Sequence, residues 1–412
     1  MRSLNVSGTA NANLQNRMNI SIIFNYLRES GPLYRAQIAK HLRLSAPAVS
    51  RAIESLIDEG YVLETEKVRI ENGRKAARLT VNSEKGYVIA VDLMRKPIRI
   101  AVSDFSATIL AEYDCFEMKD EIDVEALLIE EIRRVSELGR NPADLTAICV
   151  GIPAVVDANG SITSAYLYGN LHDKDLNLAL RKVFNVPVFV ENVANLSALA
   201  ESTYGAGIGI DNFVFIEVSN GIGAGVIIDR NLYRGKHGGA GEIGYSITDR
   251  GGLDYRGDSK GFLENYASIE AMRDKAIDAV GRNGKSLMLA LAGGDAAAIT
   301  PTVVCLAAMQ GDKLAIGIVT EIAELLAVTL SNISVVLDPE RIIVGGDICR
   351  LPGTEELFLA PLRGMLGQII PFDAPQIVRS ELHEKAVVVG ATHMAVESLL
   401  VGMYPYKIQA RQ

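Results

Sequence analysis

The N-terminal part of the chain contains three stretches in which apolar positions recur at the spacing of a helix face. These stretches cover residues 16–27, 34–42 and 47–59. Gly31-Pro32 ends the first, and Ser45 is an N-cap residue placed shortly before the third. Because the connection between the second and third stretches is short, the pattern predicts three helices that form a helix-turn-helix.

Two short β-type segments follow, at residues 61–64 and 77–81, with a polar turn at residues 72–75 between them. We therefore expect a winged helix-turn-helix domain over residues 1–82. Small side chains at the N-terminal end of the third helix would let it approach the major groove closely, and the wing tip is basic. The residues predicted to contact DNA are Arg35, Gln37, Ser45, Ala46, Ala48, Ser50, Arg51, Arg74 and Lys75. The alternative is an ordinary three-helix domain in which Arg51 is a solvated surface residue.

From residue 86 onward, apolar strands alternate with helices. Strands are predicted at 87–92, 98–103, 109–113, 145–151, 186–190, 213–218, 224–229 and 341–344, and helices at 124–137 and 195–204. Alternation of this kind predicts an α/β fold. Two similar strand-rich openings indicate two lobes with a cleft between them. We expect the first lobe at residues 87–200, completed by a C-terminal helix at 386–403, and the second at 201–385.

Composition adds a charge asymmetry to this division. The chain of 412 residues has a net charge of −9, yet residues 1–86 carry 13 Lys or Arg and 8 Asp or Glu. A basic head on an acidic body is typical of a DNA-binding protein with a separate second domain. The four cysteines lie far apart, the sequence has no uninterrupted apolar run of about 18 residues, and its N-terminus shows no basic start followed by an apolar signal core. We expect a cytoplasmic protein that does not span a membrane.

Two turns bear on nucleotide chemistry. The turn at residues 219–225 contains three glycines, which allow φ > 0 and bring backbone N–H groups together, as in many anion-binding loops. The corresponding first turn, at residues 93–97, has no glycine and contains Pro97, which lacks an N–H group. If two such turns clamp a triphosphate, this chain has kept one and lost the other.

Several ordered motifs resemble the ROK family, which contains repressors and sugar kinases. They are the glycine-rich segment 235–245, the preceding turn 220–225, the Glu-Asn-Val-Ala-Asn segment 191–195 and the Val-Gly-Gly-Asp segment within 343–348. The resemblance runs over residues 87–400, and the winged helix is similar to that of the family's repressor branch. It implies a two-lobed, actin-like ATPase fold of the ROK sugar-kinase type behind the winged helix.

The departures from the family pattern bear on catalysis. Where ROK kinases have an Asp-x-Gly-Gly-Thr phosphate loop, this chain has residues 92–96, and Val193 stands at the position of the catalytic Asp. A valine cannot accept a proton, so we expect no catalytic residue and no enzyme activity. The positions of the family's structural zinc ligands match Tyr245, Asp254, Arg256 and Phe262, which do not form a zinc-binding set. We expect neither a metal nor a cofactor.

The resemblance also implies a ligand site. Carboxylates and amides around a cleft suit a polyol, because they hold hydroxyl groups as donors and as acceptors. The implied effector-binding residues are Asn170, Asn192, Val193, Glu242, Tyr245 and Glu264. The alternative is that Asn192 and Glu242 only cap helices or hold loops.

The sequence thus predicts a repressor of carbohydrate-utilisation genes that binds a double-stranded DNA operator and a small carbohydrate or polyol effector. Helix-turn-helix proteins read paired half-sites, so a homodimer is expected, and a tetramer stays open. Release of DNA by the effector is the family expectation. Two alternatives are a bifunctional sugar kinase with a DNA-binding head, and a DNA-binding protein whose kinase-like domain only dimerises.

Overall fold

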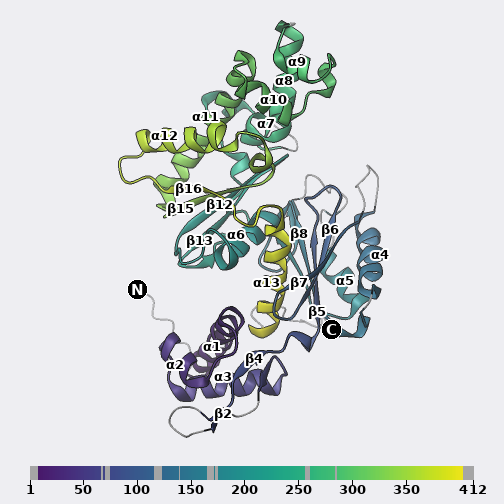
Figure 1. Ribbon diagram of the computed structural model, residues 1–412, viewed down its shortest axis with the longest axis vertical. Coiled ribbons are helices and arrows are strands. Elements are labelled where there is room, and N and C mark those ends of the chain that lie inside the picture. Colours follow the sequence, from purple (N-terminus) through teal and green to yellow (C-terminus); the bar gives the residue numbers. More distant parts are fainter. Residues whose placement is uncertain are drawn as a thin grey trace. The chain divides into compact units, whose positions relative to one another are not determined.

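The computed structural model describes residues 8–65, 68–69, 75–115, 123–138, 140–164, 171, 175–255, 260–283 and 285–401 (Figure 1). The chain folds into two compact units. Unit 1 contains residues 1–150, 175–190 and 391–412, and unit 2 contains residues 151–174 and 191–390. This division differs from the expected domain boundaries, because the N-terminal head packs with the first sheet in one unit and the helix after residue 192 belongs to the other.

The head of unit 1 has the predicted winged-helix elements. Helices α1 (Gly8–Ser30), α2 (Arg35–Leu42) and α3 (Ala46–Asp58) precede the antiparallel pair β1 (Val62–Glu64) and β4 (Leu79–Val81). Two further short strands, β2 (Val68–Arg69) and β3 (Lys75–Ala76), pair within the wing. The core of the head consists of fully buried apolar side chains from all three helices and the wing: Ile23, Phe24, Leu27, Ile38, Val49, Ile53, Leu56, Val62 and Leu79.

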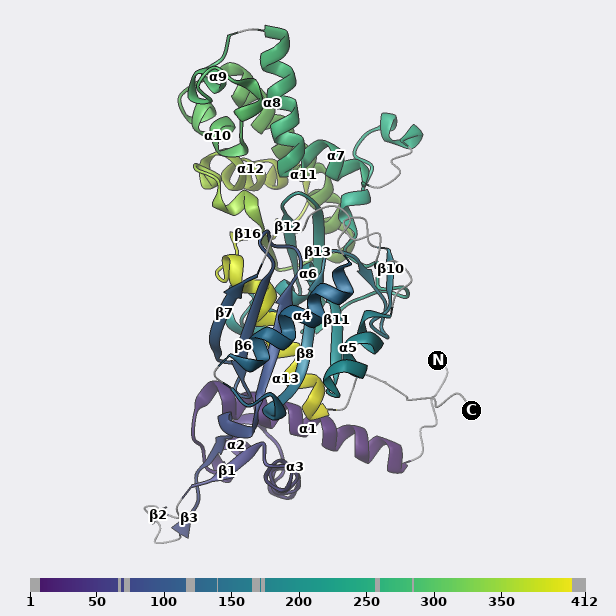
Figure 2. The ribbon, with the colours of Figure 1, turned by 90° about the vertical axis from the view of Figure 1, so that its right-hand side faces the viewer.

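The rest of unit 1 is a five-stranded sheet in the order β11-β8-β5-β6-β7. Its strands are β5 (Tyr87–Asp92), β6 (Arg99–Asp104), β7 (Ile109–Asp114), β8 (Leu145–Ile152) and β11 (Val188–Asn192), of which the last two extend into unit 2. Helices α4 (Val124–Glu137) and α5 (Leu176–Phe184) lie on one face of the sheet, and the C-terminal half of α13 (Ala386–Val401) lies on the other (Figures 1 and 2).

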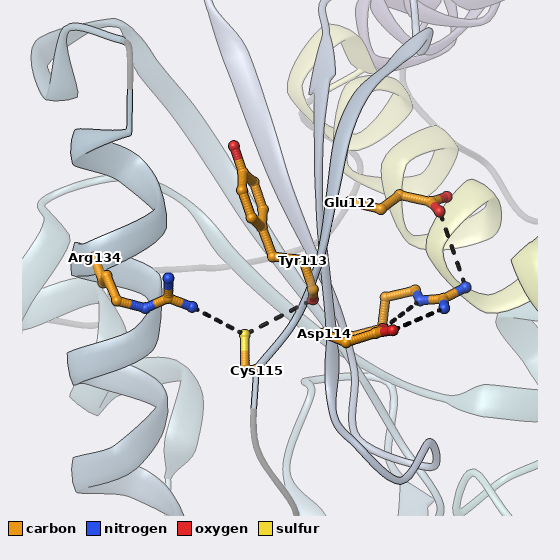
Figure 3. A network of polar contacts seen from close by, with 6 residues as sticks. Glu112, Tyr113, Asp114, Cys115 and Arg134 are labelled. Atoms are coloured by element: carbon orange, nitrogen blue, oxygen red, sulfur yellow. Dashed lines mark hydrogen bonds and ion pairs between the residues drawn. The ribbon is translucent and has the colours of Figure 1, made fainter.

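Strand β7 forms one edge of this sheet, and one polar contact network lies on each side of its C-terminal end (Figure 3). Arg99 of the neighbouring strand pairs with Asp114 at 2.9 Å and with Glu112 at 3.9 Å. On the opposite side, Arg134 of α4 lies 3.7 Å from the sulfur of Cys115. Burial and the neighbouring Glu131 raise the pKa of this thiol to about 12, so it is a neutral packing group at physiological pH. None of the four cysteines, all of which lie in described residues, forms a disulfide.

Unit 2 contains a second five-stranded sheet in the order β14-β13-β12-β15-β16. Its strands are β12 (Phe213–Val218), β13 (Ile222–Ile228), β14 (Asn231–Leu232), β15 (Arg341–Gly345) and β16 (Gln376–Arg379), and β12, β15 and β16 run parallel. A short antiparallel pair, β9 (Val155–Val156) and β10 (Ile162–Ser164), also belongs to this unit.

Alternating side chains of β12 give the unit 2 sheet two apolar faces. Phe213 and Phe215 pack against α6 (Val193–Tyr204), whereas Val214 and Ile216 pack into the main core on the opposite face. That core is covered by α7 (Phe262–Ala267), α8 (Ile269–Asn283), α9 (Leu287–Leu291), α10 (Pro301–Met309), α11 (Lys313–Leu337) and α12 (Ala360–Ile369) (Figure 2).

Helix α11 is long and apolar enough to cross a membrane by length and composition alone, with Glu321 and Glu324 interrupting its apolar run. More than half of the apolar stretch is buried, and its inward side chains, such as Ile322 and Leu326, belong to the unit 2 core. Burial within the fold therefore accounts for its composition. The predicted winged helix-turn-helix and the predicted α/β body are confirmed.

Candidate functional site

The N-terminal end of α3 is capped and exposed to solvent. The Ser45 hydroxyl caps the helix by accepting a hydrogen bond from the Ala48 N–H at 3.3 Å, and Pro47 lies in the first turn. Val49, Ile53 and Leu56 bury one face of the helix in the head, which leaves the other face exposed. Ser45, Ala46 and Arg51 are exposed, while Ala48 and Ser50 are half-buried.

Two other residues predicted to contact DNA already have partners within the head. The guanidinium of Arg35 pairs with Glu64 of β1 at 2.6 Å and lies 3.8 Å from Glu54 of α3. Gln37 accepts a hydrogen bond from the Tyr34 N–H at 2.9 Å, which ties down the start of α2. Lys75 begins β3, and Arg74 lies outside the described residues.

Arg43 is a basic residue at this surface that the pattern of apolar positions did not single out. It ends α2 with φ 53°, in the left-handed region, and its side chain is exposed directly between the two helices of the helix-turn-helix. The short connection between α2 and α3 requires a residue in the left-handed region. The spacing of the two predicted helices could therefore have pointed to Arg43.

In unit 2, Asn192 holds the junction between β11 and α6. Its side-chain oxygen accepts hydrogen bonds from the N–H groups of Ala194 at 2.8 Å and Asn195 at 3.4 Å, and its amide nitrogen donates to the Ala154 carbonyl at 2.9 Å. The preceding Glu191 is buried and pairs with Arg234 at 2.8 Å. Asn192 therefore caps a helix, as the structural alternative anticipated, and this role occupies most of its hydrogen-bonding capacity.

Glu264, in the first turn of α7, joins that helix to the glycine-rich turn. Its two carboxylate oxygens accept from the N–H groups of Ile222 at 2.9 Å and Gly261 at 3.0 Å. Gly244 lies so close that a Cβ atom at this position would be 2.5 Å from the Glu264 side chain, so only glycine fits here. The carboxylate of Glu264 is thereby fixed beside the segment that carries Glu242.

Glu242 immediately precedes a short 3₁₀ turn (Ile243–Tyr245) that packs against α7, and Tyr245 is the last residue of that turn. Burial, and the negative charge of Glu264, raise the pKa of Glu242 to about 7. The pKa of Tyr245 is raised by burial and by both carboxylates. These three predicted effector residues therefore lie within electrostatic range of one another, and a neutral carboxyl beside a carboxylate can both donate and accept hydrogen bonds from hydroxyl groups.

The remaining predicted positions are less informative. Val193 is only 4 % exposed, so it offers little surface, and Asn170 lies outside the described residues. Two of the positions compared with zinc ligands, Asp254 and Phe262, line a pocket of about 360 Å³ together with Asp249, Gly251, Tyr255 and Tyr266. Among the described residues, no three His, Cys, Asp or Glu side chains gather as a metal site would require.

Comparison with known proteins decides the family. Residues 88–398 match the model of the ROK family, and residues 21–63 match that of the bacterial regulatory proteins of the arsR family. The chain belongs to the ROK family. A xylose repressor of Caldicellulosiruptor bescii is 29% identical over 405 residues, which cover 95% of this chain and 98% of that protein.

Solved structures agree with the fold. A ROK family transcriptional regulator described as a homologue of the E. coli MLC protein superposes with a TM-score of 0.80 at 24% identity, covering 95% of this chain and 99% of that one. A ROK family glucokinase from Streptomyces griseus has a TM-score of 0.64 at 26% identity, covering 75% and 99%. The chain thus combines a helix-turn-helix head with a ROK domain.

The two turns compared above with phosphate loops, at residues 93–97 and 219–225, are held by hydrogen bonds within the protein. In unit 1, Asp92 is fully buried and accepts a hydrogen bond from the Met94 N–H at 2.9 Å, and burial raises its pKa to about 6. In unit 2, the Ser219 hydroxyl donates to the buried carboxylate of Glu217 at 2.6 Å and accepts from the Asp347 N–H at 2.9 Å. A carboxylate therefore lies next to each turn.

Proposed function

We propose that this chain is a cytoplasmic transcriptional repressor of carbohydrate-utilisation genes. A homodimer binds a double-stranded DNA operator through the winged helix over residues 1–82, and a small sugar or polyol binds the ROK domain and releases the DNA. The exposed, capped N-terminus of α3 is the observation that carries the proposal, because a helix presented in this way fits the major groove.

Within this proposal, Arg51 reads a base or a phosphate, and Ser45, Ala46, Ala48 and Ser50 let α3 approach the groove closely. Arg43, Arg74 and Lys75 contact the DNA backbone from the turn and the wing. Arg35 and Gln37 contribute indirectly. Arg35 links α2 to Glu54 of α3 and to Glu64 of β1, and Gln37 closes the first turn of α2.

The proposed effector site consists of Glu242, Tyr245 and Glu264, with Asn170, Asn192 and Val193 at its edge. The paired carboxyl groups support a ligand rich in hydroxyl groups. We infer that the site performs no phosphoryl transfer. Val193 cannot act as a general base, and the turn at residues 93–97 has no glycine and contains Pro97, which offers no N–H group to a phosphate.

The test begins with selection of binding sequences from a random DNA library by the full-length protein. Fluorescence anisotropy on the selected duplex then compares the wild type with Arg51→Ala. We expect the variant to bind about 5-fold to 100-fold more weakly, the range for loss of one good base contact. Arg282→Ala is the matched control, because Arg282 is an exposed arginine of α8 in unit 2. Equal affinity of wild type and Arg51→Ala would contradict the assignment of α3 as the recognition helix.

A further inference from the structure

Helix α13 is the element that belongs to both compact units. It is one continuous helix from Ala386 to Val401, and the division between the units falls immediately after Gly390. Its first turn is therefore part of the unit that carries the proposed effector site, and the rest is part of the unit that carries the head. A helix transmits displacement along its length because its backbone hydrogen bonds resist bending.

In unit 2, α13 contacts the backbone of α6. A Cβ atom at Gly390 would lie 1.9 Å from the Leu196 carbonyl oxygen, so the two helices touch at a point where only glycine fits. Leu196 lies one turn after Asn192 and Val193, at the start of the same helix. A shift of α6 on ligand binding would therefore be passed directly to the start of α13.

In unit 1, α13 is joined to α1 of the head by a chain of polar contacts, which we name the α1–α13 clasp (Ser21, Arg28, His393 and Glu397). Arg28 lies 3.0 Å from His393 Nδ1, and His393 Nε2 lies 3.3 Å from one carboxylate oxygen of Glu397. The other carboxylate oxygen of Glu397 accepts a hydrogen bond from the Ser21 hydroxyl at 2.9 Å.

The chemistry of the clasp fixes the direction of each hydrogen bond. A guanidinium only donates, so Nδ1 of His393 accepts and Nε2 carries the proton that is donated to Glu397. Burial alone would raise the pKa of Glu397, but His393, Ser21 and Arg28 together lower it to about 2. The carboxylate therefore stays ionised, and an aligned chain of charge-assisted bonds sets how α1 lies on α13.

Helix α1 in turn supports α3, since both contribute to the core of the head. A separate apolar contact holds the head in unit 1: the ring of Phe105 lies 6.1 Å from that of Phe24 and 5.0 Å from that of Tyr61. Phe24 meets Phe105 edge-to-face and Tyr61 stacks on it, and apolar ring contacts of both kinds are less directional than hydrogen bonds. The rings therefore account for attachment of the head, and the clasp accounts for its orientation.

We propose that Arg28, His393 and Glu397 are positioning residues that couple the ligand state of unit 2, through α13, to the orientation of the DNA-binding head. This inference rests on the proposed function, because it presupposes that a sugar alters DNA binding. Ser21 supports the clasp by holding the second oxygen of Glu397.

The test measures coupling, which a purely structural role would leave unchanged. DNA affinity is determined by anisotropy without sugar and with the sugar that shifts it most, chosen from pentoses, hexoses, their N-acetylamino derivatives and polyols. The ratio of the two affinities is compared between wild type and Glu397→Gln. Glu130→Gln serves as the matched control, since it makes the same change on an exposed residue of α4 in the same unit.

We expect Glu397→Gln to fold, to bind the sugar as tightly as wild type when DNA is absent, and to lose at least three-quarters of the fold-change in DNA affinity. Ser21→Ala, which removes one hydrogen bond, should give a smaller loss and replaces Glu397→Gln if that variant does not fold. An unchanged ratio in the folded variant overturns the inference. If no sugar shifts the DNA affinity of the wild type, the proposed function fails instead.

Discussion

Glu242 offers a direct test of the electrostatics of the proposed effector site. Its pKa is about 7 in the folded protein, against an ordinary value of 4.5, because burial and the charge of Glu264 both disfavour ionisation. Below pH 4.5 the carboxyl is protonated whether or not the chain is folded, so it has no effect on stability. As pH rises from 4.5 to 7, the unfolded chain releases the proton while the folded protein keeps it, and stability falls; above pH 7 the full cost is present.

The substitution Glu242→Gln mimics the protonated carboxyl and removes this cost. Each pKa unit corresponds to about 1.4 kcal/mol, so the raised pKa of Glu242 costs at most about 3.5 kcal/mol of stability. Allowing for partial access of solvent, we expect the variant to exceed wild type in free energy of unfolding by about 1 to 3 kcal/mol at pH 8. At pH 4.5 the two proteins should have nearly the same stability.

Urea denaturation followed by circular dichroism at pH 4.5 and pH 8 measures both values. Glu324→Gln is the control, because Glu324 is an exposed residue of α11 with no ion pair among the described residues. The reasoning would be refuted if Glu242→Gln changed stability equally at the two pH values, or if it destabilised the protein at pH 8.

Three further changes test other parts of the account. Phe105→Ala, which removes a fully buried ring packed on the head, should lower the free energy of unfolding by about 3 to 5 kcal/mol and expose the head to proteolysis first; resistance equal to wild type would contradict the packing role. Ser45→Ala should cost about 1 kcal/mol of stability through loss of the α3 cap, whereas Ser45→Gly should cost only a few tenths, and equal losses would argue against capping. Wild-type protein should not consume ATP when sugars are added, and sugar-dependent ATP hydrolysis that disappears in Glu242→Ala would establish the kinase alternative.

The sequence predicted several elements closely, and β5, α4 and β12 coincide with the ranges expected for them. Ser45, Pro47 and Gly60 delimit α3, and the structure places that helix within one residue of the prediction. Helix α6 begins two residues before its predicted start, since the Asn192 side chain caps it directly at the end of β11. Local signals therefore sufficed to predict the start of a helix where the capping residue follows a turn, as in α3. They were less exact where the cap is also the last residue of a strand, as in α6.

Contacts between distant segments could not be predicted in this way. The partner of Arg35 is Glu64, on a strand of the wing, and that of Glu264 is the backbone of Ile222, 42 residues earlier. The grouping of the head with the first sheet depends on Phe105, a turn residue, and on His393 and Glu397 near the C-terminus. Spacing along the chain carries no information on such pairings.

The most direct test of the account is the DNA affinity of the full-length wild-type protein with and without sugar. Anisotropy on the selected duplex, repeated across the panel of pentoses, hexoses, N-acetylamino sugars and polyols, provides it. The account predicts that at least one of these compounds weakens DNA binding by about fivefold or more, the lower range of allosteric coupling. Tight, sequence-specific DNA binding that no compound of the panel alters would contradict it.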